Sequence, residues 1–409
     1  MHKAVQGILF LKNMATGILA PVLTLALLQH GANICTISLF IGLYSATIIL
    51  AEFPSGIFAD LCGRKTSFLL SAVLYVISYA LLIVSSGAAL LSVSIIINGL
   101  GRAFSSGSLD ALVIDQSGGH GKSLEWVTSR LAILESAGLA FGALSGGLLA
   151  GLGHRYLGNL GVNTFLYIVL FLLAACFVRE EKRIHPGVAV PNGFQTVLRQ
   201  TKASLSFFMR PGIVRALAVF ALATGFALNA IETYWQPALN GMQAPYWLFG
   251  VVSFGGFGFV ICGSWLSERM LSRFGSRAVP LLLTIKALFG GSMMLLSFQK
   301  NAFSFVTVYL AVYLFIGSGS VAESTLLNQA APANHRAGIL SLSSLVLQVG
   351  GLLAAAGGYL VSTYSRFQNA WLLAGVILLL CAAFFAPMTK RSLQAPAAYG
   401  SGRQSSEIS

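Results

Sequence analysis

Residues 56–65 read Gly56-Ile57-Phe58-Ala59-Asp60-Leu61-Cys62-Gly63-Arg64-Lys65 and hold three charges in their last six positions. The stretches on either side, between Lys12 and Glu52 and between Lys65 and Arg102, contain no Asp, Glu, Lys or Arg. A helix that spans a bilayer needs about 20 mostly apolar residues. Each stretch is therefore too long for one helix, and turn residues near its middle divide it in two. Residues 56–65 are predicted to end one membrane helix and form the polar loop before the next.

The composition of the whole chain excludes a water-soluble protein. Only 9% of its 409 residues are charged and 56% are hydrophobic, whereas soluble proteins carry about 25% charged residues. The same composition excludes a disordered chain, which needs low hydrophobicity and high charge. The five cysteines lie far apart, with no C-x-x-C pair and no neighbouring histidine cluster. Neither a disulfide framework nor a metal site is predicted.

Counting along the chain predicts an all-α integral membrane protein with twelve transmembrane helices. The first six lie near 4–28, 34–58, 66–86, 89–114, 127–152 and 158–178, and the second six near 213–238, 246–267, 278–298, 302–327, 337–363 and 368–388. This divides the chain into an N-terminal six-helix half (1–178), a polar cytoplasmic linker (179–212), a C-terminal six-helix half (213–388) and a disordered cytoplasmic tail (389–409).

The basic residues predict the orientation of these helices. With both termini on the cytoplasmic side, 18 of the 25 Lys and Arg fall in inner segments and only 3 in outer loops, as the positive-inside rule requires. The net charge of +13 therefore reflects topology, and no nucleic-acid partner is predicted. We expect a multi-pass protein of a bacterial-type inner (plasma) membrane.

The two halves resemble one another in sequence. Residues 109–116 (LDALVIDQ) align with 322–329 (AESTLLNQ) at an offset of 213, which places Asp110 opposite Glu323. The loops that contain Gly63 and Gly275 align at an offset of 212, and Gly146-Gly147 aligns with Gly357-Gly358 at 211. Such a repeat indicates duplication, and two six-helix halves around a central cavity are a transporter architecture.

Residues 56–65 closely resemble G-x-x-x-D-x-x-G-R-K, the signature loop between helices two and three of the major facilitator superfamily. The number of spans, the half-repeat and the place of the linker are also similar, over nearly the whole chain. The resemblance implies a secondary transporter and a gating loop made of Gly56, Asp60, Gly63, Arg64, Lys65 and Asp115. Asp60 is placed to accept hydrogen bonds at a neighbouring helix N-terminus, Arg64 can pair with Asp115, and Gly56 permits close helix contact.

Two further patterns resemble bacterial drug–proton antiporters of that superfamily. Arg102 precedes Gly107 as in their R-x-x-x-G motif, with one extra residue between the two. Helix five carries Gly138, Gly142, Gly146 and Gly151 at intervals of four or five residues, without the usual proline. These glycines fit an antiporter motif and equally fit ordinary packing of membrane helices through small residues.

Ionisable residues at bilayer depth cost ~2.5–3.5 kcal/mol and so have a partner or a task. The acids predicted to couple proton movement are Glu135, Asp110, Glu232 and Glu52. Glu135 lies near the depth of Lys12, and Arg102 could stabilise its deprotonated form. Glu323 is expected to pair with Lys286, and Asp110 with Arg130, as structural or gating contacts; Glu52 could belong to the gating loop.

A second set of residues is predicted to line the substrate cavity: Arg102, Lys12, Asn13, Asn229, Tyr234, Trp235 and Gln236. Glu232 is expected near the outer mouth, nineteen residues into helix seven, or ~28 Å along it. The aromatic residues next to it form either an interfacial belt or a wall that faces substrate.

The predicted function is proton-coupled efflux of a hydrophobic or amphipathic small molecule by alternating access. The alternative is a proton-coupled uptake symporter for a sugar, organic anion or other metabolite, in which Arg102 and Lys12 would bind an anion. A sensor without transport is a third hypothesis. No nucleophile–base constellation indicates an enzyme, and no nucleotide-binding motif is present. The partners expected are the substrate, protons and the bilayer, with the protein a monomer and no cofactor.

Overall fold

The computed structural model describes residues 3–106, 108–109, 112–113, 124–152, 154–178, 180, 213–273, 278–330 and 336–387. These residues form helices and no strand. The helices of the first half are α1 (Lys3–Leu19), α2 (Leu23–Gln29), α3 (Ile37–Cys62), α4 (Arg64–Val84), α5 (Ala88–Ser105), α7 (Leu124–Leu149) and α8 (Leu157–Phe177), with a 3-10 turn at His154–Tyr156. Those of the second half are α10 (Ile213–Gly241), α11 (Tyr246–Arg273), α12 (Ala278–Ser297), α13 (Ala302–Ala330), α14 (Arg336–Tyr364) and α15 (Asn369–Phe385).

The helices agree with the predicted membrane spans in place and character. Within the described ranges, nine helices are long and apolar enough to cross a bilayer, and the bent pair of α1 and α2 makes a tenth. Two shorter apolar helices, Ile37–Glu52 and Asn369–Phe385, lie where the second and twelfth spans are predicted. The predicted linker and tail fall outside the described residues, apart from Glu180.

The first span is broken near its far end. α1 stops at Leu19 and α2 starts at Leu23, and their axes differ by 53°. Pro21 lies in the gap. Proline lacks the amide proton that would continue the helical ladder, and its ring clashes with the preceding turn, so the bend has a local cause in the sequence.

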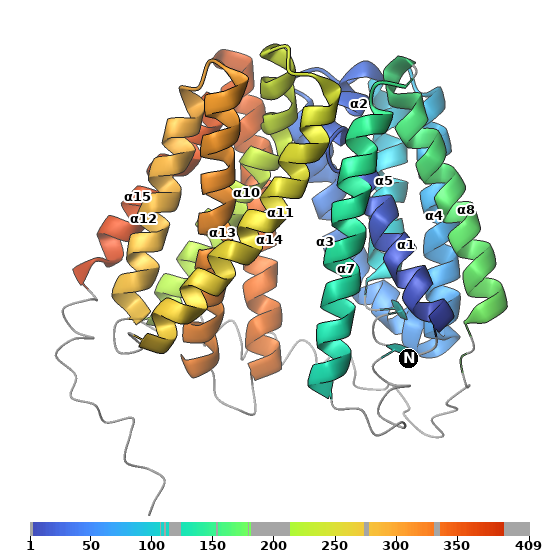
Figure 1. The fold of residues 1–409 in the computed structure, drawn as a ribbon, viewed down its shortest axis with the longest axis horizontal. Coiled ribbons are helices and arrows are strands. Elements are labelled where there is room, and N and C mark those ends of the chain that lie inside the picture. The colour runs from blue at the N-terminus through green and yellow to red at the C-terminus, as the bar shows by residue number, and fades with distance from the viewer. Residues whose placement is uncertain are drawn as a thin grey trace, which may run out of the picture.

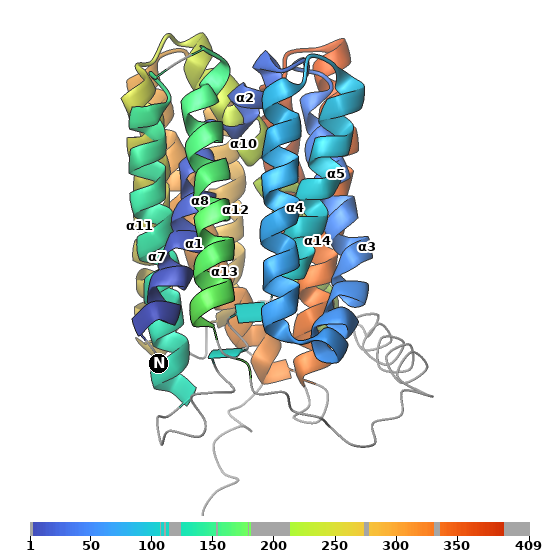
Figure 2. The same cartoon turned by 90° about the vertical axis from the view of Figure 1, so that its right-hand side faces the viewer.

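The helices form two groups that run along a common direction, one from each half of the chain (Figure 1). In the first group α1 packs on α7, α3 on α5, and α4 on α8; the second group has the corresponding pairs α10–α14, α11–α13 and α12–α15. α3 meets α14, α7 meets α11 and α2 meets α10 between the groups. Figure 2 shows α2 at the end of the molecule opposite the N-terminus.

The glycines of α7 allow its close contact with α1. A Cβ on Gly138 would lie 2.7 Å from the Phe10 carbonyl oxygen, and Cβ atoms on Gly142 and Gly146 would overlap the carbonyl oxygens of Met14 and Ile18. The prediction that this stripe lets helix five approach helix one is confirmed, and backbone packing alone accounts for these three glycines.

Two close contacts between the groups of helices lie at the end opposite the N-terminus, which we call the closed end. There Gly147 of α7 faces Gly250 of α11, where a Cβ on Gly147 would be 2.6 Å from the Gly250 Cα. Gly358 of α14 faces Ser38 of α3 in the same way, with 3.3 Å to the Ser38 Cβ. Toward the N-terminal end, which we call the open end, the two groups diverge (Figure 1).

Candidate functional site

Two opposite charges of the first half lie within electrostatic range of one another. Arg102 lies in the last turn of α5, and Glu135 lies in α7. Both residues are exposed in the structure, and Glu135 is one of the groups whose charge acts on the Arg102 guanidinium. The structure therefore brings these two residues of separate helices within electrostatic range of one another, and stabilisation of a Glu135 carboxylate by Arg102 stays a prediction.

Tyrosines surround the Arg102 end of this pair. Tyr75, Tyr44 and Tyr167 all lie within electrostatic range of the guanidinium. The Tyr75 and Tyr167 rings stack with centroids 4.3 Å apart, and Tyr79 lies 5.9 Å from Tyr75 and 5.8 Å from Tyr167. This aromatic wall from α4 and α8 was not predicted from the sequence. The spacing of Tyr75 and Tyr79, one helical turn apart, was the available signal.

Lys12 and Asn13 lie on α1, beside the contact with α7. Lys12 is buried, and the Asn13 side chain donates a 3.0 Å hydrogen bond to the Leu9 carbonyl of its own helix. The Asn13 Cβ lies 2.8 Å from where a Cβ on Gly138 would be. Asn13 thus takes part in the packing of α1 on α7.

Glu232 of α10 is held by a tyrosine of α13. The Tyr313 hydroxyl donates a hydrogen bond to the Glu232 carboxylate, and Glu232 remains exposed. The Tyr309 ring stands 4.5 Å from Tyr313 and 5.2 Å from Trp235, so the acid borders an aromatic ladder. α10 continues nine residues beyond Glu232 to Gly241, so the acid lies before the tip of the helix, and its place near the outer mouth stays a prediction.

Three predicted cavity residues that lie within one turn after Glu232 are not exposed to a cavity. Tyr234, Trp235 and Gln236 have relative exposures of 1%, 1% and 3%. Tyr234 lies 3.3 Å from the Ser362 hydroxyl, and Trp235 packs on Phe249. These three predicted cavity residues instead build the closed end, because the side chains turn into the helix contacts there.

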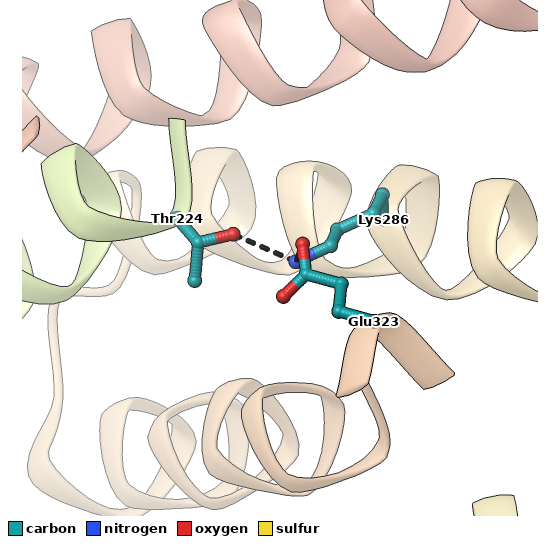
Figure 3. A network of polar contacts seen from close by, with 3 residues as sticks. All are labelled: Thr224, Lys286 and Glu323. Atoms are coloured by element: carbon teal, nitrogen blue, oxygen red, sulfur yellow. Dashed lines mark hydrogen bonds and ion pairs between the residues drawn. The ribbon is translucent and has the colours of Figure 1, made fainter. Parts of the chain in front are cut away.

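Lys286 and Glu323 form the ion pair that the sequence predicted. Their charged atoms are 2.8 Å apart, and the side chains are 2% and 18% exposed, respectively. The Lys286 ammonium also donates a 2.7 Å hydrogen bond to the Thr224 hydroxyl (Figure 3). One buried cation thereby links α10, α12 and α13, and the Glu323 carboxylate balances its charge, as a buried ion requires.

The gating loop is held by an acid that the sequence did not single out. Glu180 accepts hydrogen bonds of 2.7 and 2.9 Å from the backbone amides of Arg64 and Lys65, the first two residues of α4. A carboxylate at a helix N-terminus satisfies orphan amides and is favoured by the helix dipole. The Lys65 ammonium donates to the Ala175 carbonyl at 2.8 Å, near the end of α8. The linker acids were the available signal, but the sequence did not assign one to this loop.

The remaining predicted residues have simpler positions. Gly63 adopts a φ of +98°, which favours glycine. The prediction that Gly56 permits a close helix contact does not hold here: a Cβ on it would meet no atom within 4 Å, because the groups of helices stand apart at the open end. Glu52 is exposed, and Asn229 accepts a hydrogen bond from Thr233. The side chains of Asp60, Asp110 and Asp115 lie outside the described residues.

Among the residues that the structure describes, no cluster of His, Cys, Asp and Glu is suited to hold a metal ion. The chemistry available at the site is that of exposed acids beside a guanidinium and tyrosine hydroxyls. Such groups can take up and release protons and can bind polar parts of a small molecule. They offer no activated nucleophile.

Comparison with known proteins gives one family. The family described as "Major Facilitator Superfamily" matches residues 7–355. The quinolone resistance protein NorA of Staphylococcus aureus (strain MRSA252) is 23% identical over 234 residues, which are 56% of this chain and 55% of NorA. The uncharacterised MFS-type transporter YxaM of Bacillus subtilis (strain 168) is 24% identical over 60% of this chain and 61% of its own. The matched region thus spans little more than half the length of these relatives.

Solved structures share the fold. The nucleoside transporter NupG superposes with a TM-score of 0.77 at 14% identity, over 95% of this chain and 98% of that one. A bacterial homologue of the human lysosomal transporter Spinster, in an inward-facing and unoccupied conformation, gives 0.73 at 15% identity, over 96% and 98%. A D-xylose–proton symporter gives 0.69 at 16% identity, over 95% and 97%. At these identities the likeness concerns the fold.

Proposed function

The chain belongs to the major facilitator superfamily and is a multi-pass membrane transporter, and on that premise we propose that it exports hydrophobic or amphipathic small molecules in exchange for protons. The observation that carries this proposal is the exposed pair of Arg102 and Glu135. It puts a group that can exchange a proton within electrostatic range of a cation.

The pair suggests how proton and substrate movement are linked. With Glu135 deprotonated, its carboxylate and the Arg102 guanidinium neutralise one another. When Glu135 binds a proton, the charge of Arg102 is no longer compensated and the local field changes by one unit. Each conformation then favours one protonation state, and alternation of the two conformations couples the proton to the substrate.

The observed conformation represents one of these states. The groups of helices meet at the closed end and diverge at the open end, where the N-terminus lies. With the orientation predicted from the basic residues, the open end faces the cytoplasm of a bacterial-type cell and both termini lie there. Substrate would enter from that side as Glu135 gives its proton to water. A single chain supplies both groups of helices, which suits a monomer.

The proposed direction of transport rests on sequence similarity. NorA, which is 23% identical over the matched region, carries the name of a quinolone resistance protein. The alternative of proton-coupled uptake stays open because the fold is shared with a nucleoside transporter and with a D-xylose–proton symporter. Transport by the purified protein in liposomes distinguishes export from uptake.

The test uses the purified protein in liposomes with an imposed pH gradient. Ethidium and ciprofloxacin serve as probes, and a protonophore removes the gradient. Export predicts gradient-driven movement of probe against proton flow, abolished by the protonophore. Glu135→Gln should remove the dependence on the gradient while leaving probe binding, and Arg102→Ala should weaken both.

Glu268→Gln is the matched control, because Glu268 is an exposed acid of α11 with no place in the proposed site. It should transport like the parent protein. Movement of probe in the same direction as the protons would establish uptake. Gradient-driven transport by Glu135→Gln at the parent rate would overturn the role assigned to this acid.

A further inference from the structure

The break in the first span carries an unusual set of hydrogen bonds. In an uninterrupted helix the Thr24 amide would donate to the Ala20 carbonyl, four residues earlier. Here both groups bind the side chain of Gln236 instead. The Thr24 amide donates to Gln236 Oε1 at 2.9 Å, and Gln236 Nε2 donates to the Ala20 carbonyl at 2.9 Å. One carboxamide thus occupies the place of one helical hydrogen bond, and such an insertion bends a helix.

The inserted side chain comes from the other group of helices. Gln236 belongs to α10, and its side chain is buried at the closed end. A carboxamide has one donor group and one acceptor oxygen, as a peptide does, so it can satisfy both freed backbone groups of α1 and α2. A carboxylate, an ammonium group or an alkyl side chain cannot do this, because each lacks a donor, an acceptor or both.

The repeat places this contact where two related helices meet. Asn13 and Pro21 in the first span match Asn229 and Pro237 in α10, both at an offset of 216. Gln236 therefore stands at the position of Ala20. The first copy contributes its backbone, and the second copy contributes a side chain that replaces a backbone bond. The two copies have diverged at the position that makes the contact.

We propose that Gln236 is a positioning residue that holds the closed end shut, and that its withdrawal lets α1 and α2 join into one straighter helix. When Gln236 leaves, the Thr24 amide and the Ala20 carbonyl can bond to each other, while the carboxamide meets water. No buried backbone group is left without a partner in either state. The two states can then differ little in free energy, as a transport cycle requires.

The proposal rests on alternating access and not on the direction of transport or on the substrate. The native Cys35 offers a reporter that needs no substrate. Its thiol lies 3.3 Å from the Ser362 carbonyl of the other group, and the residue is half-buried at the closed end. Opening of that end would expose it to water. The chain has four other cysteines, Cys62, Cys176, Cys262 and Cys381. When these four are replaced by serine, only Cys35 can react with the reagent.

The experiment measures how fast a membrane-impermeant maleimide modifies Cys35 in right-side-out vesicles. Gln236→Leu fills a similar volume and cannot form either hydrogen bond. Loss of two hydrogen bonds from the closed state alone should speed labelling on the order of tenfold. Asn240→Leu removes a carboxamide from an exposed position one turn further along α10 and should leave the rate unchanged.

A second variant tests the same idea from the other helix. Pro21→Ala restores a backbone amide at the break and favours a continuous helix, so it should also speed the labelling of Cys35. If Gln236→Leu reaches the membrane and is labelled at the parent rate, the proposal is overturned. If Gln236→Leu does not accumulate, an unchanged rate in Pro21→Ala overturns it. Faster labelling in a protein that moves no probe in liposomes would refute the proposed function and support this gate.

Discussion

Removing one charge of the Lys286–Glu323 pair is expected to destabilise the protein more than removing both. The two side chains are 2% and 18% exposed, and their charged atoms are 2.8 Å apart. Glu323→Leu leaves a buried ammonium group with the Thr224 hydroxyl as its described partner. Lys286→Met leaves a carboxylate that reaches water in part. The double variant leaves neither charge.

The burial of each group sets the expected sizes. Breaking a buried pair from one side costs ~3–5 kcal/mol, because the remaining charge stays in a medium of low dielectric constant. We expect Glu323→Leu near the upper value, since its ammonium cannot hydrate, and Lys286→Met near the lower value, since its carboxylate can hydrate or bind a proton. The double variant should lie within ~1 kcal/mol of the parent protein, because apolar side chains replace such pairs at little cost.

Thermal unfolding of the purified protein in detergent, followed by tryptophan fluorescence, measures this order. With an unfolding entropy of about 2.1 cal/mol/K per residue, the costs of the single variants should lower Tm by roughly 3–6 °C in a chain of 409 residues. Thr224→Val is the matched control, since it removes a hydrogen bond to Lys286 and keeps the ion pair. If the double variant unfolds at the same temperature as Glu323→Leu, an uncompensated charge is not the cause of the lost stability. Equal midpoints for all four proteins would show that the pair contributes nothing.

Two further predictions concern the ends of the molecule. Glu180→Gln keeps the size of the side chain but removes the negative charge that accepts hydrogen bonds from the Arg64 and Lys65 amides. We expect the free energy of unfolding to fall by ~1 kcal/mol, which would appear as a small fall in Tm. A Tm above that of the parent protein would contradict the role of Glu180 as a helix cap. Gly147→Val places a side chain where a Cβ alone would lie 2.6 Å from the Gly250 Cα. It should therefore force the closed end apart and speed the modification of Cys35 by the impermeant maleimide. A parent-like rate would show that the two helices separate there without opening the gate.

Several features of the structure follow from local sequence. The spans coincide with the described helices because burial of apolar residues in a bilayer depends on composition over about 20 positions. The α1–α7 contact follows from the stripe of Gly138, Gly142 and Gly146, since only small residues let helix backbones approach so closely. The pairing of Lys286 with Glu323 was also predicted, because two opposite charges at similar depth in adjoining spans have few other partners.

The tertiary structure alone decided which side chains meet across helices. From the sequence Glu135 could have faced Lys12 or Arg102, and it is the packing of α5 and α7 that brings Arg102 within electrostatic range of it. Glu180 reaches the gating loop from beyond the end of α8, far away in sequence. Gln236 has a polar side chain of the kind that lines a cavity, yet this side chain enters the break between α1 and α2. Membrane insertion depends on each segment alone, whereas these contacts depend on the depth, rotation and conformational state of two segments at once.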